Sequence, residues 1–234
     1  SYYGSDVNTP INLKNEKTIF SDESTIETAY QYAYEKGNQK LIDANMVGIP
    51  LDTEVKKDGK TISKAETKYD NPVNLLPSSV LSYNMQSNTP STEVTYDIYD
   101  GKRNLIQYTT KAGVSTSIIW GYNQTQPIAK IEGAKLSDIT QTLINSIVNA
   151  SDDTNANYSE STLLNQLDAF RIALPNFQIS TYTYKPLIGV TTITPPSGIR
   201  EYYFYDTANR LESVKTNENG VLTTLKEYQY HYKP

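Results

Sequence analysis

Residues 203–214 read YFYDTANRLESV, and in this stretch the pair Tyr205-Asp206 stands six residues before Leu211. The same spacing occurs twice more, and a looser copy has Glu in place of Asp and is one residue longer. In chain order the copies are Tyr34-Glu35 to Leu41, Tyr69-Asp70 to Leu75, Tyr99-Asp100 to Leu105 and Tyr205-Asp206 to Leu211. A repeat at fixed spacing predicts one structural unit that is built several times along the chain.

Each copy of this repeat predicts the turn of a β-hairpin. Tyr suits a pleated sheet because its ring covers apolar area while its hydroxyl keeps a polar end. Asp is poor in strands and good in turns, where its carboxylate accepts backbone N–H groups, and the Leu then begins the next strand. A lone hairpin is marginal in water, so the units should pair edge to edge. The sequence therefore predicts a mainly β fold of antiparallel hairpins that form a continuous sheet or shell segment.

Alternating residues and turn dipeptides support strands around these units. From Ile26 onward one face carries Thr28, Tyr30, Tyr32 and Tyr34, which is typical of a half-buried strand. Gly37-Asn38 then predicts a turn. Asp58-Gly59, inside a predicted hairpin over 55–69, and Asn219-Gly220 both suit tight type I′ turns, where the central residues need positive φ.

The hydrophobic period changes in the middle of the chain. Two stripes at helical spacing are formed by Ile139, Leu143, Ile144 and Ile147, and by Leu163, Leu167, Phe170 and Leu174. Ser137 is the expected cap of the first helix, Ser159 or Ser161 that of the second, and Pro175 should end it. These stripes predict a helical hairpin inserted near residues 135–175 that packs over the sheet.

The expected organisation is thus a β segment over 1–134, the helical insertion over 135–175 and a second β segment over 176–234, all in one continuous structural unit. The chain begins at Ser1 rather than Met, and we expect it to be a piece of a longer polypeptide.

Composition narrows the functional classes. The net charge of −5 and the absence of a basic run argue against a nucleic-acid surface. The chain has no Cys, which removes disulfides, thiolate nucleophiles and sulfur-ligated metals. No stretch approaches the roughly 20 apolar residues of a membrane helix.

Catalytic and metal-binding patterns are also missing from the sequence. His231 is the only histidine and sits in an alternating Tyr-rich run, so we expect an ordinary strand residue rather than part of a triad. The repeat carboxylates Asp70, Asp100 and Asp206 should cap turns rather than form an acid–base pair. Calcium loops and glycine-rich phosphate loops are not recognisable. We therefore expect no enzyme activity, no cofactor and no metal site.

Trp120 and Tyr122 are the candidates for a binding surface. Together with the Tyr-rich faces they could form an aromatic platform for sugar rings. The alternative is an aromatic ladder that stabilises cross-strand pairs.

Several of these segments resemble a known family. The pattern of Tyr203, Tyr205-Asp206, Arg210-Leu211 and Val214, followed by Gly220 and Tyr228-x-Tyr230, resembles the YD repeat of RHS-repeat proteins. The strings 119–123 and 127–132 (IWGYN and PIAKIE) and 181–190 (TYTYKPLIGV) resemble segments of RHS-like secreted or surface proteins from Bacteroidetes, in which a helical insert also occurs. The resemblance spans about residues 65 to 232.

The resemblance implies a long β-ribbon that spirals into a hollow shell, often as the carrier of a toxic C-terminal domain. The leading expectation is a non-catalytic structural segment of a large protein, secreted or at the cell surface in association with the outer membrane. Its partners would be the remainder of its own longer chain and a secretion or cell-surface complex, without nucleic acid or a transmembrane segment. The alternatives are a cell-surface binding module, such as an adhesin or carbohydrate binder, and the cargo of an outer-membrane secretion machine.

Overall fold

The structure is a computed structural model that describes residues 2–3, 11–153, 160–218 and 220–230. The chain divides into two compact units. Unit 1 comprises Ser1–Asp97 and Thr109–Gly113, and unit 2 comprises Ile98–Tyr108 and Val114–Pro234. Strand β8 (Leu105–Thr110) has residues in both units, and each unit is described separately below.

The strands of unit 1 pair antiparallel in the order in which they occur in the chain. They are β1 (Tyr2–Tyr3), β2 (Leu13–Ile19), β3 (Thr25–Gln31), β4 (Asp52–Lys57), β5 (Lys60–Lys68), β6 (Ser79–Tyr83) and β7 (Pro90–Tyr99). The β4–β5 hairpin has the predicted two-residue turn, with φ of 49° at Asp58 and 78° at Gly59. These values match the left-handed conformation that a type I′ turn requires.

The predicted strand from Ile26 through Tyr34 is too long. β3 ends at Gln31, and the backbone then turns, because Lys36 N donates to Tyr32 O and Asn38 N donates to Ala33 O. Burial explains the difference: Tyr32 and Ala33 are buried, and the Tyr32 hydroxyl donates to Leu13 O at 2.7 Å. The contact of Tyr32 with Leu13 on the neighbouring strand β2 therefore outweighs the alternating pattern that predicted a longer strand.

A short helix that the sequence reading did not anticipate follows this turn. In α1 (Gln39–Asp43) the Asn38 side chain accepts a hydrogen bond from Leu41 N, so the residue expected in a turn is a helix N-cap. Leu41 is fully buried and forms a small core with Ala33 and Leu51.

The strands of unit 2 also pair antiparallel in chain order. They are β9 (Ser115–Gly121), β10 (Gln126–Glu132), β11 (Gln178–Lys185), β12 (Gly189–Thr194), β13 (Glu201–Tyr205), β14 (Leu211–Glu218) and β15 (Val221–Glu227). Every residue of β15 is exposed.

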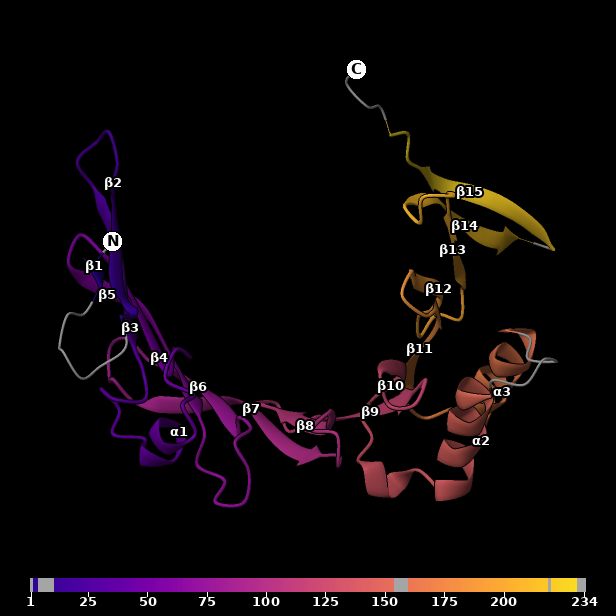
Figure 1. Ribbon diagram of the computed structural model, residues 1–234, viewed down its shortest axis with the longest axis horizontal. Coiled ribbons are helices and arrows are strands. Elements are labelled where there is room, and N and C mark those ends of the chain that lie inside the picture. Colours follow the sequence, from indigo (N-terminus) through magenta and orange to yellow (C-terminus); the bar gives the residue numbers. More distant parts are fainter. Residues whose placement is uncertain (1, 4–10, 154–159, 219, 231–234) are drawn as a thin grey trace. The chain divides into compact units, whose positions relative to one another are not determined.

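The predicted helical hairpin is present in unit 2. It consists of the 3-10 turn η1 (Leu136–Asp138), α2 (Gln141–Asp152) and α3 (Glu160–Ala173), and the two α-helices lie against β9, β10 and β11 (Figure 1). Both predicted stripes face this contact, and the buried core contains Ile119, Ile128, Ile131, Ile139, Ile147, Leu163, Leu167, Phe170, Leu174 and Ile179. The core of unit 2 therefore sits where helices cover the sheet.

The predicted helix caps are wrong in detail. Ser137 lies within η1, which Asp138 closes by accepting a hydrogen bond from Lys135 N at 2.8 Å, and α2 begins only after Thr140. Ser161 lies inside the first turn of α3 instead of preceding it, and Ser159 is outside the described residues.

The mainly antiparallel β fold with a helical hairpin near residues 135–175 is confirmed. None of the helices in the described part of the chain is long and apolar enough to cross a membrane.

Candidate functional site

The turn after Tyr99 shows how the repeat works. Asp100 Oδ1 accepts hydrogen bonds from Lys102 N at 2.9 Å and Asn104 N at 2.8 Å, and Asp100 Oδ2 accepts one from Asn104 Nδ2 at 3.0 Å. Arg103 takes the left-handed conformation with φ of 71°. Leu105 then begins β8. One carboxylate thus satisfies the donors of a tight loop, which is the role that the sequence predicts for it.

The turn after Tyr205 has the same construction. Asp206 Oδ1 accepts from Ala208 N at 2.8 Å and Arg210 N at 2.9 Å, and Asn209 has φ of 60°. Asp206 Oδ2 accepts from Arg210 Nε at 2.8 Å, and these bonds with Arg210 lower the pKa of the carboxyl. Leu211 begins β14. Two distant copies of the repeat therefore build one loop geometry.

The remaining copies have different surroundings. Asp70 accepts a hydrogen bond from Ser78 Oγ across a longer connection, and β6 begins at Ser79 instead of at Leu75. Tyr69 and Leu75 pack against the small core of unit 1. In the looser copy, Glu35 accepts from Tyr32 N at 2.9 Å and pairs with Lys14.

Replacing Asp100 by alanine should weaken the turn between β7 and β8. The two backbone N–H groups of the loop lose their acceptor, so we expect a loss of about 1–2 kcal/mol in the free energy of unfolding. Amide hydrogen exchange should be faster at Lys102 and Asn104 than in the wild type. The exposed residue Glu212 is the matched control, and Glu212→Ala should leave these rates unchanged. Equal protection in Asp100→Ala and the wild type would contradict the capping role.

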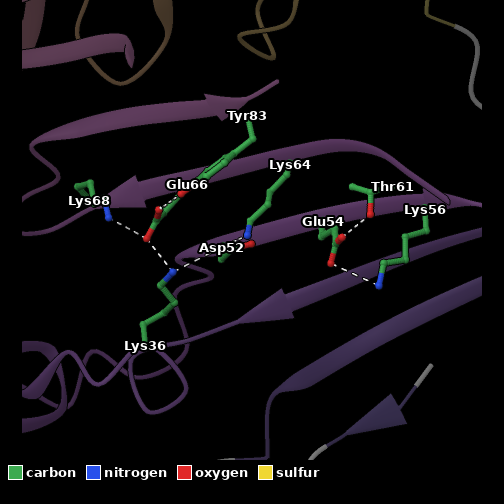
Figure 2. A network of polar contacts seen from close by, with 9 residues as sticks. All are labelled: Lys36, Asp52, Glu54, Lys56, Thr61, Lys64, Glu66, Lys68 and Tyr83. Carbon is green, nitrogen blue, oxygen red and sulfur yellow. Dashed lines mark hydrogen bonds and ion pairs between the residues drawn. The ribbon is translucent and has the colours of Figure 1, made fainter. Parts of the chain in front are cut away.

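A second candidate site is a network of charged side chains in unit 1 (Figure 2). Its centre is the cross-strand pair of Asp52 on β4 and Glu66 on β5, whose side chains are each only 5% exposed. Lys36 lies between them, with its Nζ 2.7 Å from Glu66 Oε1 and 3.5 Å from Asp52 Oδ2. Lys64 Nζ is also 3.5 Å from Asp52 Oδ2. Two negatively charged side chains that face each other across a strand pair repel one another. Here the ammonium groups of Lys36 and Lys64 compensate this repulsion.

The remaining bonds of this network converge on Glu66. Lys68 Nζ donates to Glu66 Oε1 at 3.0 Å, and the Tyr83 hydroxyl donates to Oε2 at 2.6 Å. Lys64 Nζ lies 4.7 Å from the centre of the Tyr83 ring, so this lysine links Asp52 to the aromatic face.

Burial would raise the pKa of Glu66, but hydrogen bonds from Lys36, Tyr83 and Lys68 outweigh it and lower the pKa from 4.5 to about 2. The hydrogen bond to Glu66 raises the pKa of Tyr83 to about 12. A general acid needs a carboxyl that is still protonated near neutral pH, and Glu66 is ionised there. The arrangement therefore suits the bonding of β4, β5 and β6 and the turn before α1 better than it suits acid catalysis.

This lowered pKa predicts a specific acid sensitivity. The folded state holds Glu66 ionised more strongly than the unfolded chain does, so the stabilisation is fully present above about pH 4.5 and is lost as the pH falls toward about 2. Urea unfolding at a series of pH values should show a steeper loss of stability in the wild type than in Glu66→Gln. Parallel curves for the two proteins would contradict the prediction.

A third candidate site is the turn between β9 and β10, next to the predicted binding residue Trp120. Three consecutive residues other than glycine lie in the left-handed region, with φ of 51° at Tyr122, 57° at Asn123 and 61° at Gln124. Left-handed backbone costs roughly 1–2 kcal/mol per residue for most side chains, so surrounding contacts must hold this turn. Strain of this kind is concentrated at binding and catalytic sites.

The end of α2 supplies two of these contacts. Ser151 Oγ accepts a hydrogen bond from Tyr122 N at 3.2 Å, and Asp152 Oδ1 accepts one from Asn123 N at 2.7 Å. The close approach requires Gly121, because a Cβ atom there would lie 2.9 Å from the Ile128 side chain and would also clash with Ser151 Oγ. The helical hairpin is thereby joined to the turn.

Other segments hold the rest of the turn. Asn104 Nδ2 donates to Gln124 O at 2.9 Å, which links the turn to the Asp100 loop. Tyr184 N donates to the Tyr122 hydroxyl at 2.9 Å, and the two rings meet edge to face with centroids 5.7 Å apart. The Trp120 Nε1–H donates to Leu105 O at 2.9 Å. The two residues predicted as a binding surface are therefore fixed by different neighbours, Trp120 by Leu105 and Tyr122 by Tyr184.

Among the described residues, the structure contains no group of three or more His, Cys, Asp or Glu side chains that could hold a metal ion. His231 lies outside the described residues. The sequence reading singled out none of Lys36, Asp52 and Glu66. Their one local signal is the alternation of Lys and Glu along β4 and β5, which also fits an ordinary exposed hairpin.

The fold and these sites define a protein of sequential antiparallel hairpins in which polar side chains fix turns and strand register. No protein-family model matches the chain, and a search of curated proteins finds no match.

Similar solved structures do exist. A crystal structure of TcdB2-TccC3-Cdc42 matches with 13% sequence identity and a TM-score of 0.43. A crystal structure of TcdB2-TccC3-TEV matches with 15% sequence identity and a TM-score of 0.42. A Photorhabdus luminescens Tc holotoxin pore matches with 12% identity and a TM-score of 0.39. In each case the match covers 88% of this chain and 11% of the other chain.

Proposed function

We propose that this chain is a non-catalytic structural segment of a large RHS-like protein, secreted or at the cell surface. It builds part of a β-shell or surface ribbon that carries or encloses a toxin domain. The observation that carries the proposal is the antiparallel pairing in chain order within each unit, combined with one loop geometry at Asp100 and Asp206. A chain that pairs each strand with its sequence neighbour can extend a sheet by adding further hairpins.

The polar sites support a structural role. The carboxylates of Glu66, Asp100 and Asp206 accept hydrogen bonds from groups of the chain itself. Such bonds fix strand register and turn shape. The proposal therefore assigns no enzyme activity to the segment.

The partners in this proposal are the remainder of a longer chain and a secretion or cell-surface complex. In the part of the chain that the structure describes, β15 pairs with β14 alone, and Val221, Leu222 and Leu225 are exposed. An exposed, apolar edge strand readily pairs with another chain. We expect the 234-residue chain expressed alone to be oligomeric or poorly soluble, as light scattering coupled to size-exclusion chromatography would show. A stable monomer at high concentration would contradict this expectation.

Cryo-electron microscopy of the full-length parent protein, isolated from its native membrane or culture medium, tests the proposed function. We expect a closed shell of strands with additional density inside. An open sheet without an enclosed volume would overturn the carrier role.

A further inference from the structure

The pairing of β12 with β13 is the shortest among the strands from β9 to β15. Their register joins two residue pairs, Thr192 with Tyr202 and Ile193 with Glu201. In contrast, β11 and β12 are joined at five positions, and so are β13 and β14. A strand pair with few backbone hydrogen bonds opens more easily than its neighbours, because local stability depends on the bonds and contacts that opening breaks.

The sequence of the connection between β12 and β13 explains the short pairing. Pro195 and Pro196 follow the last residue of β12, and proline has no backbone N–H to donate to a neighbouring strand. Gly198 then takes a φ of 84°, and its N–H donates to Pro195 O at 2.9 Å, which turns the chain. The two strands therefore begin to pair only at Ile193 and Glu201.

Arg171, in the last turn of α3, holds the end of β12. Its guanidinium donates to four backbone carbonyl oxygens. The acceptors are Ile179 O on β11, Thr194 O at 3.3 Å, Pro195 O at 2.9 Å and Pro196 O at 3.3 Å. Arginine presents its donors in a rigid planar fork, so one side chain serves several acceptors. Arg171 thus ties α3 to β12 and to the connection that follows it.

Asp168, one turn earlier on α3, holds the start of β13. It forms an ion pair with Arg200, the residue directly before β13. Arg200 Nε also donates to Thr194 Oγ1 on β12 at 2.8 Å, and Thr216 Oγ1 on β14 donates to Arg200 O at 3.2 Å. Residues three apart lie on the same helix face, so one face of α3 reaches both strands. We call Asp168, Arg171 and Arg200 the clamp.

A side chain also holds the opposite end of the β12–β13 pair. The Tyr205 hydroxyl donates to Val190 O at 2.9 Å. This approach requires Gly189, because a Cβ atom there would lie 2.9 Å from Tyr205 Cζ. Side-chain bonds therefore hold both ends of a strand pair whose backbone pairing is short.

We propose that the boundary between β12 and β13 is a built-in opening point of unit 2, which the clamp keeps closed. Opening separates β13, β14 and β15 from β12 as one group, because longer pairings join these three strands to one another. The helical hairpin remains packed on β9, β10 and β11. This inference is independent of the proposed function, since it concerns only the pairing of strands within unit 2.

An introduced thiol tests the proposal, because the 234-residue chain has no cysteine of its own. Thr192 is buried and pairs with Tyr202, so Thr192→Cys should react with N-ethylmaleimide when β13 separates. Ser117→Cys is the matched control, since Ser117 is a buried hydroxyl residue on β9, away from the boundary. Intact mass follows the labelling of the full chain. The labelling rate reports the population of the open state when closing is faster than the reaction.

Thr192→Cys should be labelled faster than Ser117→Cys in the otherwise unchanged chain. Adding Arg171→Ala should raise the rate at Thr192→Cys by about tenfold or more, because several hydrogen bonds that hold the boundary are lost. Arg171→Lys should also raise it, since the ammonium keeps the charge but lacks the planar fork. Ile172→Ala, at an exposed neighbour on α3, should leave the rate unchanged.

An unchanged rate in both Arg171 variants would overturn the proposal. Equal acceleration at Ser117→Cys would overturn it as well, because unit 2 would then open as a whole instead of at this boundary. Arg171→Lys provides the test by itself if the alanine variant does not fold.

Discussion

Replacing Glu66 by alanine is expected to lower the free energy of unfolding of unit 1 by about 3–5 kcal/mol, the usual result of breaking a buried ion pair. The variant leaves Lys36, Lys68 and Tyr83 without the carboxylate that all three contact. The buried Asp52 carboxylate keeps Lys36 and Lys64 as its neighbours, so the loss arises from the contacts of Glu66 itself. Urea unfolding measures the loss, and faster amide exchange in β4 and β5 should locate it.

Glu54→Ala is the matched control for this experiment. Glu54 lies on β4, the strand paired with the one that carries Glu66. It forms an ion pair with Lys56 and a hydrogen bond with Thr61, but its side chain is 30% exposed (Figure 2). More exposed ion pairs contribute about 1 kcal/mol or less. A similar loss in both variants would show that burial does not set the strength of the Glu66 network.

The second large effect is expected at Phe170, in the core under the helical hairpin. Phe170 is 1% exposed and packs in the cluster that joins α3 to the sheet. Phe170→Ala should reduce the free energy of unfolding by about 3–5 kcal/mol, because it removes buried apolar surface and leaves a cavity. Trp120 fluorescence and circular dichroism during urea unfolding report the loss in unit 2.

Ile172 on the same helix provides the control, since its side chain is 78% exposed. Ile172→Ala should change stability by no more than about 0.5 kcal/mol. A small effect at Phe170 would show that the helical hairpin contributes little to the stability of unit 2. In that case Phe170→Ala should also leave intact the hydrogen bonds of Ser151 and Asp152 with the turn between β9 and β10.

The buried charge network of Asp52 and Glu66 bears on the register of β4 and β5. Replacing a buried ion pair by apolar residues is often neutral or stabilising, so such a network is weak evidence for stability as such. Asp52 and Glu66 are direct partners in the β4–β5 register, and a slip of one strand by one residue would put their side chains on opposite faces of the sheet. We therefore expect the network to specify register in addition to contributing free energy.

Local signals explain which features could be predicted without coordinates. The turn at Asp58-Gly59 and the loops at Asp100 and Asp206 depend on a residue and its next four neighbours, so their geometry is encoded in a short stretch. Their recurrence predicted a mainly antiparallel β fold. The two helical stripes were equally visible, because burial of one helix face requires apolar residues at regular spacing.

Features that depend on distant residues could not be predicted in this way. Tyr32 leaves the predicted strand because its ring is buried and its hydroxyl meets Leu13, and Lys36, Asp52 and Glu66 come together from separate segments. The Tyr122 hydroxyl meets Tyr184 N across 62 residues of sequence. Amino-acid periodicity records which side of an element is buried, whereas the partner that buries it is fixed only when remote strands and helices pack together.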